Sequence, residues 1–226
     1  MTEITDHLAE IVGRVSRAAE LANQPPSNVT IVAVSKQQSS AAIAEAFLAG
    51  QRNFGESYAQ EAVGKMTELR DLDIVWHYIG TIQANKTRLI AERFHWVHTV
   101  DRAKIAARLD EQRPHFAAPL NVLIQVNQGG EQQKGGVAPS DVAALAREIA
   151  ALPRLKLRGL MTIPPRTFDR GAERWFRELA ALRDRLRGDG FELDTLSMGM
   201  SADFEAAIAA GATCVRIGTA IFGERR

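Results

Sequence analysis

Short apolar runs alternate with helical patterns along almost the whole chain. The runs have the length and the β-branched or aromatic content of strands. They lie near residues 30–35, 53–55, 74–79, 95–98, 120–126, 155–161, 193–196 and 213–217. Strands separated by helices pair in parallel through right-handed crossovers. Eight such units in a chain of 226 residues predict an α/β fold, a (β/α)8 TIM barrel.

An additional helix is expected before the first strand. Residues 2–22 carry apolar side chains at helical spacing, and the pair Pro25-Pro26 ends the pattern. We find no linker that divides the chain, so residues 1–226 are expected to form a single domain. An open doubly wound sheet is the alternative. It is weakened because no G-x-G-x-x-G sequence follows any expected strand.

Polar residues stand at the expected starts of three helices. Such residues accept hydrogen bonds from the free N–H groups of the first helical turn. The candidates are Ser39 or Ser40, Asp101, and Ser140 or Asp141.

Composition excludes several classes of function. The 28 basic and 27 acidic residues give a formal charge of +1, without a run of like charges, so nucleic-acid and membrane-surface binding have no support. The first ten residues are acidic, unlike a secretory signal, and no apolar run approaches membrane-spanning length. Cys214 is the single cysteine, which excludes an intramolecular disulfide and a cysteine-based metal site. We therefore expect a cytoplasmic protein without a resident metal.

A lysine stands at the carboxyl end of the first expected strand. Side chains alternate along a strand, so Val32, Val34 and Lys36 share one face. If that face is the interior of the barrel, Lys36 lies at its mouth. Partial burial there disfavours the charged amine, which becomes a nucleophile for carbonyl carbons. The alternative is a lysine that marks where the strand reaches water.

Glycine- and hydroxyl-containing loops follow the last two expected strands. They span residues 197–201 (Ser-Met-Gly-Met-Ser) and 218–220 (Gly-Thr-Ala). In TIM barrels the site lies at the carboxyl ends of the strands, and phosphate is often held after strands seven and eight. Glycine lets the backbone approach an anion, and N–H groups and hydroxyls bind it. Together the two loops indicate a phosphate site, although each alone is more typical of an ordinary turn.

Two further strand residues are candidates for ligand contacts. Arg216 lies within the eighth expected strand, where a guanidinium needs partners. It either forms an ion pair inside the barrel, for example with Glu56, or donates to a ligand. His77 lies in the third expected strand and is either a hydrogen-bonded core residue or a ligand contact. The residues that follow that strand are either helix caps or ligand contacts: Gln83, Asn85 and Lys86.

Taken together, these motifs resemble those of the YggS-type pyridoxal phosphate homeostasis proteins along nearly the whole chain. The matching segments are 33–36 (Ala-Val-Ser-Lys), 54–56 (Phe-Gly-Glu), 76–80 (Trp-His-Tyr-Ile-Gly) with Gln83 and Asn85-Lys86, 158–161 (Arg-Gly-Leu-Met), 197–201, and 215–223 (Val-Arg-Ile-Gly-Thr-Ala-Ile-Phe-Gly). Two segments depart from the pattern. Ser57 stands where the family usually has asparagine, and residues 127–131 lack the usual serine.

The resemblance implies a barrel similar to the N-terminal domain of alanine racemase, with pyridoxal 5′-phosphate (PLP) as its cofactor. It implies that PLP forms a Schiff base with Lys36 and that Arg216 faces the pyridine nitrogen. It places the phosphate on Ser201, Gly218 and Thr219. His77 and Met198 complete the expected cofactor-binding set.

Little or no catalytic turnover is expected from such a site. Arginine stays protonated and can only donate, so the pyridine nitrogen opposite Arg216 must be unprotonated, which weakens the ring as an electron sink. Racemisation needs a base on each face of the substrate. Lys36 could serve as the base on one face. The tyrosines that could serve on the other face are limited to Tyr58 and Tyr78, and no second domain is expected to bring a base across the mouth of the barrel.

The resulting hypothesis is a monomeric, non-enzymatic protein for vitamin B6 homeostasis that holds PLP and delivers it to PLP-dependent apo-enzymes. Two alternatives stay open. One is a PLP-dependent amino-acid racemase or decarboxylase. The other is a cofactor-free Schiff-base aldolase on the same barrel.

Overall fold

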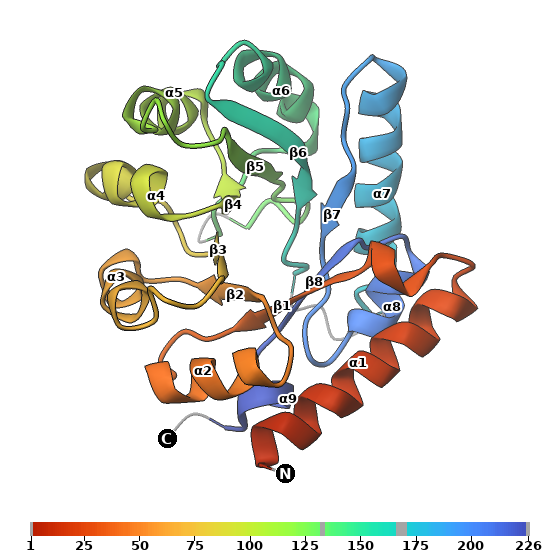
Figure 1. Ribbon diagram of the computed structural model, residues 1–226. Coiled ribbons are helices and arrows are strands. Elements are labelled where there is room, and N and C mark those ends of the chain that lie inside the picture. Colours follow the sequence, from red (N-terminus) through yellow and green to blue (C-terminus); the bar gives the residue numbers. More distant parts are fainter. Residues whose placement is uncertain (1, 132–133, 166–170, 225–226) are drawn as a thin grey trace.

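Eight parallel strands close into a barrel in chain order (Figure 1). The structure is a computed structural model that describes residues 2–131, 134–165 and 171–224. The strands are β1 (Thr30–Val34), β2 (Asn53–Glu56), β3 (Val75–Tyr78), β4 (Trp96–Val100), β5 (Leu120–Gln125), β6 (Leu155–Met161), β7 (Thr195–Ser197) and β8 (Cys214–Ile217). Because β1 pairs with both β2 and β8, the sheet has no edge. The expected TIM barrel is confirmed, and the open-sheet alternative is wrong.

Helices surround the barrel, and most of them lie where the periodicity predicts. They are α1 (Glu3–Leu21), α2 (Ser40–Leu48), α3 (Ala59–Glu68), α4 (Thr87–Arg93), α5 (Ala103–Gln112), α6 (Val142–Ala150), α7 (Glu173–Gly188), α8 (Phe204–Ala209) and α9 (Thr219–Phe222). Short 3-10 turns are η1 (Pro26–Asn28), η2 (Ala84–Lys86) and η3 (Pro139–Asp141). The additional N-terminal helix is confirmed as α1, which packs against α8 and α9 (Figure 1).

The helix caps follow the sequence expectation in one case of three. The Ser39 side chain accepts a hydrogen bond from the Ala42 N–H at 3.2 Å and caps α2. Asp101 does not cap α5, because Arg102 intervenes in an extended conformation and binds the Asp101 carboxylate at 2.7 Å. The η3 turn places Asp141 in a helical conformation before α6, so its side chain makes no cap bond.

Two separate layers of side chains stabilise the barrel. The layer between sheet and helices is apolar and includes the fully buried Phe54, Phe94, Phe176 and Phe204. The barrel interior is partly polar. A hydrogen bond of 2.9 Å joins His98 of β4 to Ser197 of β7, two strands that are not neighbours, so it crosses the interior. A polar interior needs paired hydrogen bonds and is therefore a candidate for function.

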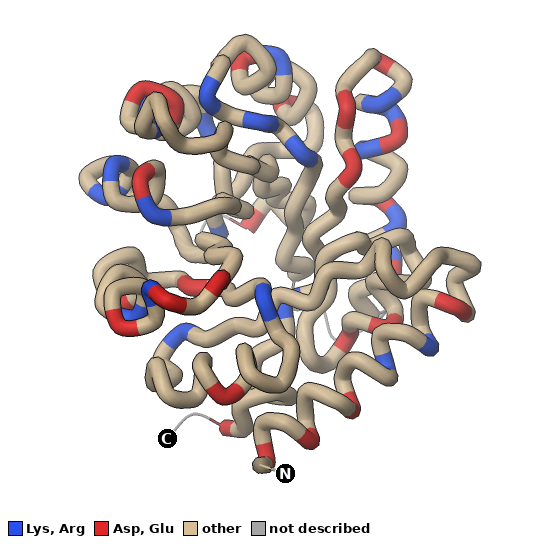
Figure 2. The backbone as a smooth tube through the Cα atoms, in the orientation of Figure 1, with Lys and Arg blue, Asp and Glu red and all other residues tan. Residues whose placement is uncertain are grey.

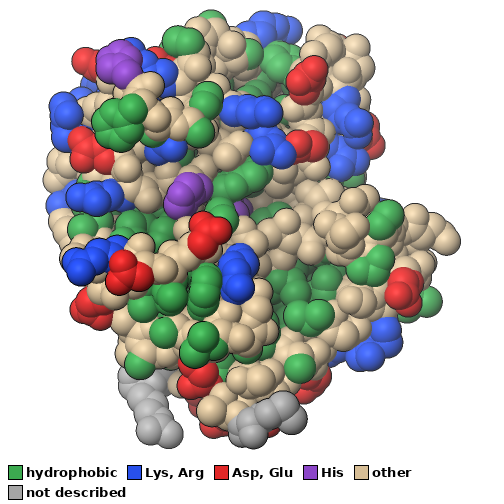
Figure 3. Space-filling view, in the orientation of Figure 1, with side chains coloured by type: hydrophobic (Ala, Val, Ile, Leu, Met, Phe, Trp, Pro, Cys, Tyr) green, Lys and Arg blue, Asp and Glu red, His purple; other side chains and the backbone are tan. Residues whose placement is uncertain are grey.

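The surface carries charges of both signs. Figure 2 shows basic and acidic residues interspersed along the helices, and Figure 3 shows the same mixture over one face. None of the described helices combines the length and the hydropathy needed to cross a bilayer.

Candidate functional site

Lys36 lies just beyond the carboxyl end of β1 and is half-buried. The register of β1 with β8 places the expected face of β1 inside the barrel, because Val32 lies opposite Arg216, whose side chain is buried in the interior. A Cβ atom built on Gly55 would lie 2.9 Å from Cγ1 of Val32, and one on Gly218 would lie 3.3 Å from Cβ of Val34. Lys36 follows in the same alternation and lines a pocket of about 390 Å³ at this rim.

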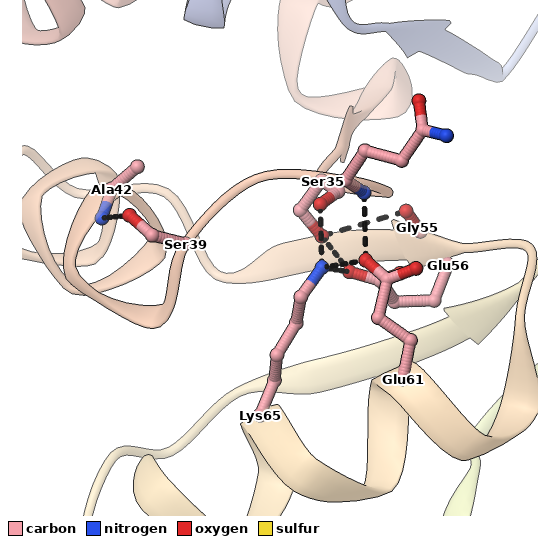
Figure 4. A network of polar contacts seen from close by, with 8 residues as sticks. Ser35, Ser39, Ala42, Gly55, Glu56, Glu61 and Lys65 are labelled. Carbon is pink, nitrogen blue, oxygen red and sulfur yellow. Dashed lines mark hydrogen bonds and ion pairs between the residues drawn. The ribbon is translucent and has the colours of Figure 1, made fainter. Parts of the chain in front are cut away.

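A buried lysine from α3 holds the backbone next to Lys36. Lys65 Nζ donates to the Ser35 carbonyl oxygen at 2.8 Å, to Oε1 of Glu56 at 2.8 Å and to Oε1 of Glu61 at 2.6 Å. Figure 4 shows Lys65 and Glu61 extending from α3 toward the turn after β1. The Lys65 side chain therefore joins α3, β1 and β2 in one polar network directly beside Lys36, the candidate nucleophile.

The same network also reaches the other side of Lys36. Oε1 of Glu61 accepts a hydrogen bond of 2.7 Å from the Gln37 N–H. Gln37 has a φ of 63°, a left-handed conformation that non-glycine residues rarely adopt. Backbone bonds on both flanks thus fix the turn that presents Lys36.

Glu56 is the most buried charged member of this network. Its Oε1 accepts from Lys65 and, at 2.7 Å, from the Ser35 hydroxyl, whereas its buried Oε2 has no hydrogen-bond partner among the described residues. Burial raises the pKa of Glu56, and the hydrogen bonds from Lys65 and Ser35 oppose that rise. In the sequence, the i,i+4 spacing of Glu61 and Lys65 is one sign of this network, whereas no local pattern indicates its contacts with β1 and β2.

Arg216 is buried in the barrel interior and does not pair with Glu56. Its NH1 donates to Ser197 Oγ at 2.7 Å, and its NH2 donates to the Thr162 carbonyl oxygen at 2.9 Å. The ion pair with Glu56 is therefore wrong, because Lys65 occupies that carboxylate. Both acceptors, a hydroxyl and a carbonyl oxygen, are neutral, so these bonds do not pair the positive charge of Arg216 with a carboxylate. Such a guanidinium is suited to donate to a neutral or anionic ligand atom.

His77 belongs to a hydrogen-bonded chain that ends at Arg216. His77 Nε2 lies 3.0 Å from Oδ1 of Asn53, and its Nδ1 lies 3.0 Å from Nε2 of His98. Since Asn53 Oδ1 only accepts, each histidine carries its proton on Nε2, and the Ser197 hydroxyl donates to Nδ1 of His98. This assignment satisfies every member with both rings neutral.

The environment of these rings favours the neutral form. His77 stacks on Trp96, with ring centroids 5.6 Å apart. Burial lowers the pKa of His77 to about 3, and burial also lowers the pKa of His98 well below its usual value.

The structure separates the His77 side chain from the rim that carries Lys36. His77 lines a different cavity, of about 350 Å³, together with Thr30, Thr195 and Thr213 at the amino ends of their strands. This cavity opens at the opposite end of the barrel. His77 was expected to contact the same cofactor as Lys36, and the structure places it in this other cavity instead. Met198, the other expected contact, follows β7 at the carboxyl rim, with its side chain fully buried in the hydrophobic core.

The glycine loops after β7 and β8 lie together at the rim. The Arg216 N–H donates to the Gly199 carbonyl oxygen at 3.0 Å and ties the loop after β7 to strand β8. Gly199 has a φ of 93°, and a Cβ there would lie 2.6 Å from Cβ of Ala207, so glycine is required. Ser201 is half-buried in the first loop. Gly218 packs against Val34, which places this loop beside β1.

The barrel, the rim lysine and the paired glycine loops define a class of protein. A family model described as "Alanine racemase, N-terminal domain" matches residues 7–226, and the chain belongs to this family. Within it, the chain is 54% identical to the pyridoxal phosphate homeostasis protein of Pseudomonas aeruginosa over 225 residues, covering 100% of this chain and 97% of the relative. It is 48% identical to the protein of that name from Escherichia coli, covering 100% of this chain and 98% of the relative. The resemblance to pyridoxal phosphate homeostasis proteins is thereby confirmed.

Solved structures agree with this assignment. PipY of Synechococcus elongatus, in a structure with PLP bound, has a TM-score of 0.84 and 36% identity, covering 97% of this chain and 100% of PipY. Alanine racemase of Corynebacterium glutamicum has a TM-score of 0.68 and 18% identity, covering 97% of this chain and 61% of that enzyme. The second likeness concerns the fold alone.

Proposed function

We propose that this protein binds PLP through Lys36 and holds it for delivery, with little or no turnover. The observation that carries the proposal is the position of Lys36. It follows β1, the strand that separates the loop after β8 from the pocket formed by the loops after β2 and β3. The PLP-bound structure of PipY and the names of the relatives support the same cofactor.

The residues present fit PLP in their chemistry. When bound, PLP supplies an aldehyde that condenses with a primary amine. Lys36 provides that amine, and Arg216 provides a donor for the pyridine nitrogen. Ser201, Gly218 and Thr219 provide hydroxyl and backbone donors for the phosphate. Thr219 begins α9, so its N–H has no acceptor within the helix.

The surroundings of Lys36 favour holding over turnover. Arg216 cannot accept a proton from the pyridine nitrogen and therefore keeps that nitrogen unprotonated. The Tyr78 hydroxyl donates to the Thr81 carbonyl oxygen at 3.0 Å, and burial raises its pKa to about 12, so it is a poor base at neutral pH. Tyr58 also lines the pocket, but it is 53% exposed, so burial does not fix its ring in place.

Three further features of the proposal extend beyond the site itself. We expect PLP-dependent apo-enzymes to be the recipients, because an amine-bound aldehyde can be passed to another lysine. We expect the protein to act as a monomer and in the cytoplasm. Each of these features remains a prediction.

Borohydride reduction of the PLP-loaded protein, followed by peptide mapping, tests the proposal. We expect the label on Lys36, and we expect Lys36→Ala to lose the visible absorption band of the bound cofactor. Lys104→Ala is the matched control, since Lys104 is exposed on α5. Label on another lysine, with the band retained in Lys36→Ala, would refute the assignment. Racemisation of alanine faster than with free PLP would favour the racemase alternative instead.

A further inference from the structure

The polar side chains that follow β3 do not cap the η2 turn or the α4 helix. Both η2 and α4 begin without a side-chain cap bond, although Gln83 and Lys86 occupy their N-cap positions. Gln83 and Lys86 instead line the 390 Å³ pocket that Lys36 also lines. The ligand-contact alternative for these two residues therefore becomes the stronger one, whereas the exposed Asn85 does not line the pocket.

The wall of this pocket is held in place by side chains from β3 and β4 and by a close backbone contact. The Tyr78 hydroxyl donates to the Thr81 carbonyl oxygen, and the Thr99 hydroxyl donates to the Gly80 carbonyl oxygen at 2.6 Å. A Cβ atom on Gly80 would lie 2.1 Å from the Ser57 carbonyl oxygen, so the loops after β2 and β3 are in close contact. The pocket is thus preformed, as ligand pockets usually are.

The pocket is cationic. Among the described residues that line it, Lys36 and Lys86 carry charge, and none is a carboxylate. Lys86 is half-buried, and its ammonium group makes no hydrogen bond or ion pair with the described residues. Neutral polar groups of Ser57, Gln60 and Gln83 complete the lining. Once Lys36 is engaged by the cofactor, Lys86 remains as a cation suited to an anionic ligand group.

The pocket and the phosphate loops lie on opposite sides of Lys36. β1 pairs with β8 on one side and with β2 on the other. Gly218 contacts Val34 from the β8 side, whereas the pocket is built from the loops after β2 and β3. A ligand in the pocket therefore approaches Lys36 without competing for the phosphate loops.

We propose that this pocket binds an α-amino acid, with its carboxylate on Lys86 and its amino group beside Lys36. Lys86 selects the carboxylate, and the cofactor aldehyde held at Lys36 selects a primary amine. The pocket of about 390 Å³ is large enough for a free amino acid that carries both groups. The inference rests on the proposed function. With the cofactor bound, the amino group would form a carbon–nitrogen bond to the cofactor carbon as the bond to Lys36 Nζ breaks, and the proton lost by the incoming amine would pass to the leaving lysine amine. Amino acids would thus promote release of the cofactor.

The first test uses the PLP-free protein with ¹³C-labelled lysine. We expect L-alanine to shift the Lys86 Cε resonance in a saturable way, with binding roughly tenfold weaker in Lys86→Met because a charge-assisted hydrogen bond is lost. Lys104→Met removes the same charge from an exposed site and should bind alanine like the wild type. An unmoved Lys86 resonance, or equal binding by Lys86→Met and the wild type, would overturn the proposal.

The second test uses the PLP-loaded protein and compares two amines of similar size. We expect Lys86→Met to raise the L-alanine concentration needed for half-release of PLP by roughly tenfold, and to leave the ethylamine concentration unchanged, because ethylamine lacks the carboxylate. An equal change for both amines would refute the carboxylate site. If borohydride labels a lysine other than Lys36, the proposed function fails, but the PLP-free titration still decides the role of Lys86.

Discussion

Replacing Lys65 with methionine tests whether the buried network beside Lys36 stabilises this rim of the barrel. The Lys65 side chain is 8% exposed and the Glu56 side chain is 0% exposed. Lys65→Met leaves the Glu56 carboxylate buried without its cation, and it also removes a donor from the Ser35 carbonyl oxygen. Removing one partner of a buried ion pair costs about 3–5 kcal/mol. That is a large part of the roughly 5–15 kcal/mol by which a domain is stable.

The expected loss depends on pH in a defined direction. Burial raises the pKa of Glu56 in the folded protein. A carboxyl group with a raised folded pKa favours folding at low pH, and this contribution is lost as the pH rises through the folded pKa. Lys65→Met should therefore be most destabilising at neutral pH. The deficit should shrink as the pH falls and Glu56 is protonated.

Urea unfolding followed by circular dichroism measures the free energy of unfolding for this series. Arg174→Met is the matched control, because the Arg174–Glu178 pair is 72% and 44% exposed and should change stability by less than about 0.5 kcal/mol. Adding Glu56→Gln to Lys65→Met should recover part of the loss, since no charge then remains buried. A loss no larger than that of Arg174→Met, or one that does not vary with pH, would refute the reasoning.

Three other predictions follow from burial and backbone contacts. Since burial lowers the pKa of His77 to about 3 and that of His98 well below its usual value, the stability that their neutral forms provide is present above about pH 6.5 and lost as the pH falls. Unfolding free energy should fall by up to about 2.7 kcal/mol per pH unit in that window, and both rings should show neutral NMR shifts at pH 5. Burial raises the pKa of Cys214 to about 11, so the native thiol should resist Ellman's reagent at pH 8 and react at once in denaturant. Gly80→Ala should lower the thermal midpoint by several degrees, because its Cβ would lie 2.1 Å from a backbone oxygen, whereas Gly64→Ala in α3 meets nothing within 4 Å and should raise it.

The sequence by itself determined the barrel and the identity of the rim residues. Strand and helix periodicities are local properties, and eight alternating units leave few topologies. Parallel strands also bring their carboxyl ends to one rim, so a lysine after β1 and glycine loops after β7 and β8 had to meet there. For this reason the relation of Lys36 to Gly218 followed from chain order alone.

The tertiary structure decided which side chains pair across the fold. Closure of the barrel brought Lys65 of α3 under the turn after β1, and it brought His77 to the amino end of the interior, away from Lys36. It also placed Lys86 in one pocket with Lys36. Such contacts join residues far apart in the sequence and depend on strand register and loop path. No local pattern encodes those quantities, because they are set only when the whole sheet closes.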